Sequence, residues 1–134
     1  MLLKNKGGEK NMIHKSQKKM HTKLTKNLLD VIVLRLINHQ SMHGYQIITE
    51  TRKLFGVYLG PSTIYPLLAN LEQQGYINSE WCMTTEKPRK IFAITNIGKA
   101  VIKSAENTIS LINKTLNTFE ETTKPTTEIA PIIQ

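Results

Sequence analysis

The chain has 134 residues, of which 40% are hydrophobic, and a formal net charge of +8. This length suits one small domain with tails, since domains commonly span about 100 to 150 residues. No apolar run approaches the roughly 20 residues of a membrane-spanning helix, and the start lacks the continuous apolar region of a secretory signal, so we expect a cytoplasmic protein with no membrane partner.

The positive charge is concentrated at the N-terminus. Residues 1–26 contain eight lysines and one acidic residue, Glu9, whereas the rest of the chain has ten basic and nine acidic residues. We therefore predict a flexible basic arm over residues 1–23. Such arms bind polyanions by neutralising phosphates, with Lys19 and Lys23 as candidate contacts. A tail that only increases solubility is the alternative.

Three helices are predicted after the arm. Residues 24–39 carry a wide apolar stripe, and Thr25 is a candidate N-cap. After a break at residues 41–44, a second helix covers residues 45–56, where Gly56 stands at the position expected after a helix C-terminus. The third helix lies in GPSTIYPLLANLEQQG, from Gly60 to Gly75. Its apolar residues follow the i, i+3, i+4, i+7 spacing of one buried face: Ile64, Leu67, Leu68 and Leu71.

The opposite face of this third helix is polar but carries no charge. It offers Ser62, Thr63, Tyr65, Pro66, Ala69, Asn70 and Gln73. Hydroxyl and amide groups can bond to phosphates and base edges, and Asn70 can pair with adenine. Pro66 suits a first helical turn, where N–H groups have no internal acceptor, if the helix begins at Ser62 or Thr63.

The pattern then changes to two strands and a final helix. Residues 76–85 and 90–95 are rich in aromatic and β-branched residues, and the turn between them contains Pro88. They predict a β-hairpin, with Trp81 in the core because a lone strand tryptophan is usually buried. Thr95 is the expected N-cap of a helix from Asn96 to about Phe119. Residues 121–134 lack periodicity and are expected to be disordered.

This order of elements predicts a mainly α fold with a small β-hairpin. We expect a winged helix-turn-helix over residues 24–95 and a C-terminal dimerisation helix over residues 96–120. The small core cannot cover the distal part of that helix, so a second copy would pack on its apolar stripe. That stripe consists of Val101, Ile109, Ile112, Leu116 and Phe119. A two-fold pair would place two recognition helices roughly 34 to 36 Å apart, one turn of B-DNA.

Four segments resemble the PadR-type transcriptional regulators. In chain order they are LLDVIVLRLI, HGYQI, STIYPLLANLEQQGYI and PRKIFAITNIG. The resemblance implies a homodimer that binds a partly palindromic operator and usually represses transcription. It also implies that Ser62, Thr63, Tyr65 and Pro66 face the DNA, with Arg89 and Lys90 near its backbone. Lys87, in the same basic turn, is a further candidate for a phosphate contact. Some members of the family sense flat aromatic compounds, which leaves room for an unidentified small-molecule effector.

Other functions are weighed against this hypothesis. The chain has no catalytic constellation and no phosphate-binding glycine loop, so we expect neither an enzyme nor a cofactor. His39 and His43 are separated by a turn and lack neighbouring ligands, so we predict no metal. A winged helix can also serve as a protein interaction module, because fold does not determine function. The third possibility is an architectural DNA-binding protein dominated by its lysine-rich arm.

Overall fold

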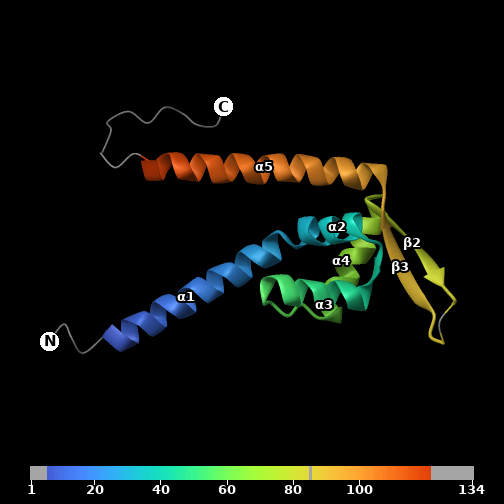
Figure 1. Ribbon diagram of the computed structural model, residues 1–134, viewed down its shortest axis with the longest axis horizontal. Coiled ribbons are helices and arrows are strands. Elements are labelled where there is room, and N and C mark those ends of the chain that lie inside the picture. The colour runs from blue at the N-terminus through green and yellow to red at the C-terminus, as the bar shows by residue number, and fades with distance from the viewer. Residues whose placement is uncertain (1–5, 85, 122–134) are drawn as a thin grey trace.

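The computed structural model describes residues 6–84 and 86–121 (Figure 1). Its elements in chain order are α1 (Lys6–Asn27), α2 (Leu29–His39), β1 (Met42–His43), α3 (Gly44–Phe55), α4 (Pro61–Gln73), β2 (Ile77–Cys82), β3 (Arg89–Ile94) and α5 (Asn96–Glu121). The mainly helical fold with a small sheet confirms the predicted fold class. The tail that we predicted to be disordered lies outside the described residues, apart from Glu121 at the end of α5.

The sheet has three antiparallel strands in the order β1-β3-β2. The predicted hairpin is confirmed as β2 and β3, which we call the wing, with Trp81 opposite Lys90 and Ile77 opposite Ile94. Strand β1 was not predicted from the sequence, where these residues were read as a break. Its two residues pair with β3 far along the chain, Met42 opposite Phe92, and so short a strand has no periodicity to detect.

The core lies where α2, α3 and α4 meet the inner face of the sheet. The predicted leucine stripe of α4 is confirmed, because Ile64, Leu68 and Leu71 are buried and Leu67 is partly buried against them. Helices α3 and α4 form the helix-turn-helix. Gly56 ends α3 in the left-handed conformation with φ 67°, as predicted.

The N-terminal region differs from its prediction. Residues 6–27 form helix α1 in place of a flexible arm. The segment contains no proline and seven lysines, which are good helix formers, although it lacks the regular apolar stripe by which helices are recognised. Thr25 is therefore no N-cap. It is buried in the last turn of α1, where its Oγ1 donates to the carbonyl of His21 at 2.8 Å.

Pro66 is also placed differently from the prediction. Helix α4 begins at Pro61 with Gly60 as its N-cap, so Pro66 lies in the second turn, inside the helix. The prediction of a later start was wrong because Pro61 itself takes the first helical position, where proline is favoured. Pro66 cannot donate to the carbonyl of Ser62, and that oxygen therefore lacks its usual helical partner on the exposed side of α4.

Two long helices run away from the wing in Figure 1, α1 and α5. As predicted, Thr95 caps α5, since its Oγ1 accepts from the N–H of Gly98 at 3.1 Å. The proximal part of α5 packs on the core through Ile102 and Val101, whereas Ile109, Ile112, Leu116 and Phe119 are exposed. None of the helices in the described ranges is apolar over a length that could cross a bilayer.

Gly98→Ala is expected to destabilise the fold. A Cβ at this position would lie 2.1 Å from the carbonyl oxygen of Tyr76 and 2.6 Å from Cδ1 of Ile94. Because the first of these atoms is backbone, α5 would have to shift, at a cost of about 1–3 kcal/mol for overpacking. Urea unfolding measures the change. The control is Gly8→Ala in α1, where a Cβ meets nothing within 4 Å and no loss of stability is expected. An unchanged midpoint for Gly98→Ala would contradict the prediction.

Candidate nucleic-acid interface

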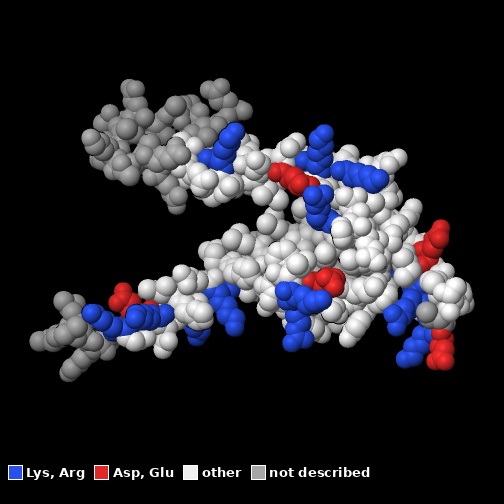
Figure 2. Space-filling model, viewed as in Figure 1, with Lys and Arg blue, Asp and Glu red and all other residues white. Residues whose placement is uncertain are grey.

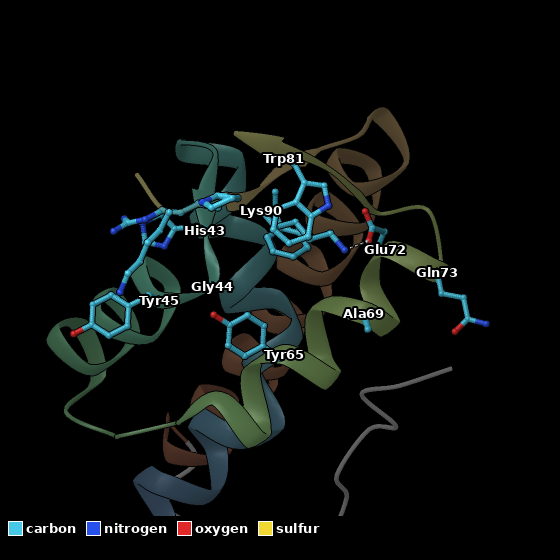
Figure 3. A pocket seen from close by; sticks show the side chains of 13 residues that line it. His43, Gly44, Tyr45, Tyr65, Ala69, Glu72, Gln73, Trp81 and Lys90 are labelled. Atoms are coloured by element: carbon cyan, nitrogen blue, oxygen red, sulfur yellow. Dashed lines mark hydrogen bonds and ion pairs between the residues drawn. The ribbon is translucent and has the colours of Figure 1, made fainter. Parts of the chain in front are cut away.

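A groove of about 750 Å³ separates α4 from the wing (Figure 3). We call it the α4–wing groove. The start of α3 closes one end, α4 forms one side and the wing forms the other. Its lining residues are His43, Gly44, Tyr45, Tyr65, Ala69, Glu72, Gln73, Trp81, Lys87, Pro88, Arg89, Lys90 and Phe92. Aromatic rings and basic groups therefore face the same space, next to the exposed polar face of α4.

The ring of Tyr65 occupies the space next to Gly44 that a side chain at that position would fill. A Cβ on Gly44 would lie 2.6 to 2.8 Å from ring and hydroxyl atoms of Tyr65, so no larger residue fits while the ring keeps its position. Figure 3 shows the Tyr65 hydroxyl directed toward Gly44, across the junction of α3 and α4. The ring remains half-exposed. The absence of a side chain at Gly44 thus permits this position of the Tyr65 hydroxyl.

Gly44→Ala is expected to displace Tyr65 and weaken any DNA binding that depends on it. If Tyr65 reads a base, discrimination at that base pair should fall by about 1–3 kcal/mol, the usual value of one specific contact. Binding titrations on matched and mismatched DNA measure this effect. Tyr65→Ala should reproduce it, and Gly44→Ala should add little to Tyr65→Ala because both act through one ring. If the double variant loses the sum of the two single effects, Gly44 and Tyr65 do not act through the same ring.

Glu72 connects α4 to the wing. It accepts a hydrogen bond from the Oγ of Ser79, and its Oε1 lies 3.5 Å from Nζ of Lys90. The Lys90 ammonium also lies 5.7 Å from the centre of the Phe92 ring. Lys90, predicted as a phosphate contact, therefore has an internal anionic partner. A phosphate would have to compete with Glu72 for it.

Arg89 contacts His43 on the other side of β3. Its Nη1 lies 2.8 Å from Nε2 of His43, while the backbone N–H of Gln46 points at Nδ1 from 3.3 Å and caps α3. Both partners are donors, and a neutral imidazole accepts at only one nitrogen, so the two contacts compete. Burial and the charge of Arg89 lower the pKa of His43 from its ordinary value. A lowered pKa favours the neutral form of the imidazole, which suits the role of acceptor.

The predicted DNA-contacting residues lie on two surfaces. Those in the helix-turn-helix and wing form the first surface. Tyr65, Lys87, Arg89 and Lys90 line the α4–wing groove, and Ser62, Thr63, Pro66 and Asn70 are exposed along α4 beside it. Asn70 is already engaged, because its Oδ1 accepts from Nε2 of Gln74. Pairing with adenine would require that oxygen to take a second donor or to release Gln74.

Lys19 and Lys23 belong to the second surface, on α1. Five lysines share one face of this helix, together with Thr22, and we call them the lysine stripe: Lys15, Lys18, Lys19, Lys23 and Lys26. Their spacing of three and four residues places them in adjacent turns. Within the described residues none of them has an ion pair. Figure 2 shows basic side chains over α1, α3 and the wing along the lower edge of the view, with another group over α5 above.

Trp81 was predicted in the core, but its side chain is 64% exposed. Ile77, Ser79 and Trp81 are every second residue of β2, so all three lie on the face of the strand that points toward α4. Ile77 is buried under the helices, whereas Trp81 lies nearer the tip of the hairpin and forms part of the groove. The alternation of side chains along a strand predicts the correct face for Trp81. The sequence does not show how far the hairpin extends past the core.

The described residues contain no group of three or more His, Cys, Asp or Glu side chains that could hold a metal ion. His43 is used in capping α3 and in contacting Arg89. The expectation of no metal and no cofactor therefore stays a prediction from the sequence.

A helix-turn-helix, a three-stranded sheet and a basic wing beside an exposed polar helix define a winged-helix DNA-binding domain. A family model described as the transcriptional regulator PadR-like family matches residues 33–104, just over half of the chain. The protein belongs to this family of transcriptional regulators, which confirms the resemblance found in the sequence.

Solved structures agree with this assignment. A PadR family transcriptional regulator from Eggerthella lenta is 26% identical with a TM-score of 0.72, and the match covers 83% of this chain and 97% of that one. A transcriptional regulator from Clostridium thermocellum is 27% identical with a TM-score of 0.65, covering 73% and 98%. A PadR-like regulator from Bacillus cereus, at 21% identity, TM-score 0.66 and coverage of 73% and 96%, shares the fold. No curated protein matches the sequence significantly.

Proposed function

We propose that this protein is a sequence-specific transcriptional repressor that binds a partly palindromic operator as a homodimer. The observation that carries the proposal is the outward face of α4. It holds exposed hydroxyl and amide groups, Ser62, Thr63, Tyr65 and Asn70, on a helix anchored by buried leucines. A helix with such a face in the major groove can distinguish bases by hydrogen bonds, which a face of lysines would do less well.

The attraction to DNA is supplied chiefly by the lysine stripe of α1. In the wing, Lys90 has Glu72 as a partner and Arg89 contacts His43, so both must exchange an internal contact for a phosphate. The helix α4 itself has no basic residue. The lysines of α1 have no such competing ion pair within the described chain. They can neutralise phosphates without losing an interaction.

The homodimer is proposed to form through α5. The exposed apolar residues Ile109, Ile112 and Leu116 recur at helical spacing beyond the part of α5 that packs on the core. An apolar groove of about 630 Å³ between α2, the end of α3 and α5 begins beside Ile109. If two α5 helices pair antiparallel near Ile112, Leu116 of one copy lies close to Thr108 of the other, at the edge of that groove. One self-complementary interface would then cover both surfaces.

Selection of bound sequences from a random DNA pool tests the proposal. A two-fold symmetric motif is the expected result, with half-sites about one helical turn apart. Binding without enrichment of any motif would favour the architectural protein that acts through its basic helix. Absence of binding would favour the protein interaction module. A reporter gene carrying the selected motif then distinguishes repression from activation. The small-molecule effector remains a prediction of the family resemblance.

A further inference from the structure

Trp81 is the only tryptophan of the chain, and it lies in an unusual position for this residue. Its indole is 64% exposed on the inner face of the wing, at the mouth of the α4–wing groove. Figure 3 shows it on the wing side of the groove, across from Tyr65 on α4. An exposed indole leaves a large apolar area in water, which is costly unless a partner covers it.

Polar contacts join the two sides of the groove near Trp81. Glu72 on α4 binds Ser79 and Lys90, which lie on the two wing strands next to Trp81. These contacts direct the Lys90 ammonium toward Glu72 and Phe92. The indole, opposite Lys90 in the sheet, remains exposed at a groove whose two sides are joined by the contacts of Glu72. An aromatic anchor of this kind is typical of binding surfaces.

The partner that would cover the Trp81 indole is the DNA backbone. When α4 occupies a major groove and the wing reaches over the neighbouring backbone, the strand that borders the groove must pass between them. That passage is the α4–wing groove. Its basic groups, Lys87 and Arg89, suit phosphates, whereas Trp81 presents an apolar ring with one N–H donor. Deoxyribose is the apolar part of the backbone, and its phosphates are the acceptors.

We infer that Trp81 is a DNA-contacting residue, with its indole packed on the deoxyribose of the strand in the α4–wing groove and its Nε1–H donating to a phosphate oxygen. The inference rests on the proposed function and adds an uncharged anchor to it. The contact positions the wing on the backbone, so it strengthens binding to any sequence that α4 accepts.

The test uses the full-length protein and the DNA enriched by selection. Because Trp81 is the only tryptophan, its emission reports on the groove directly. Saturating DNA is expected to reduce acrylamide quenching of Trp81 by at least twofold. Trp81→Ala is expected to weaken DNA binding about tenfold, and Trp81→Phe, which keeps an apolar ring but loses the N–H, about threefold. The slope of affinity against salt should stay unchanged, since no charge is removed.

Leu111→Ala is the matched control, because it truncates another exposed apolar side chain on α5, away from the groove. Its affinity should remain within about twofold of wild type. Far-UV circular dichroism and the unfolding midpoint should be equal for all variants. Unchanged quenching together with unchanged affinity of Trp81→Ala would overturn the inference while the proposed function stands. If the wild-type protein binds no DNA in the selection, both are wrong.

Discussion

Ile112→Asp combined with Leu116→Asp should convert the protein from a dimer to a monomer and weaken operator binding by about 100-fold or more. The two side chains are exposed on the apolar stripe of α5 in the isolated chain, so carboxylates there cost little in a monomer. In a paired α5 interface each carboxylate would be buried without a partner, which is strongly unfavourable. Loss of the second half-site then removes a gain of about 10²–10⁴ that linked binding provides.

Sedimentation velocity measures the mass, and titration with the selected operator measures the affinity. Ser110→Asp combined with Asn117→Asp is the control. Both positions are exposed on the opposite side of α5, and the change in charge is identical. This control should remain dimeric and bind DNA nearly as wild type. A dimeric Ile112→Asp, Leu116→Asp variant would remove α5 from the interface.

Replacing Lys15, Lys19 and Lys23 by glutamine should weaken binding to operator and random DNA alike. The three lysines belong to the stripe on α1. Glutamine resembles lysine in helix propensity, so α1 should persist while three charges disappear. Affinity is expected to fall roughly 10- to 100-fold at physiological salt, and the salt slope should flatten by about 0.9 for each phosphate that the protein no longer neutralises.

The matched control removes the same number of charges from α5, by Lys99→Gln, Lys103→Gln and Lys114→Gln. Both variants have equal net charge, so a general effect of charge would weaken binding equally. We expect only the α1 variant to lose most of its affinity and salt dependence. Equal losses would show that the lysine stripe has no specific role, and loss at the operator alone would mean that it reads sequence.

Much of the fold could be predicted from local pattern. The stripe of Ile64, Leu68 and Leu71 predicted α4, Gly56 marked the end of α3, and Thr95 marked the start of α5, because each depends on residues a few positions apart. Helix α1 was not predicted, because its sequence lacks a local signal of this kind. Its residues favour a helix by intrinsic propensity, but its charged sequence lacks the apolar period that signals packing.

The candidate site could be predicted only in part. The polar face of α4 and the basic turn were visible as residue types, so Tyr65 and Arg89 were identified as candidates. Their partners were not visible. Gly44 packs on Tyr65 from another helix, and His43 contacts Arg89 across 46 positions of sequence. Such contacts depend on how elements that are distant in the sequence pack together. The local spacing of residues does not show this.

By itself, the sequence determined the class of protein, since four motifs in order and a polar, uncharged helix face are local properties of the chain. Only the tertiary structure decided which of the candidate groups are available to DNA. It joined Lys90 to Glu72, brought Arg89 against His43 and left Trp81 exposed at the mouth of a groove. The physical reason is that burial and pairing depend on distances between elements, whereas helical and strand periods record only which side of an element a residue occupies.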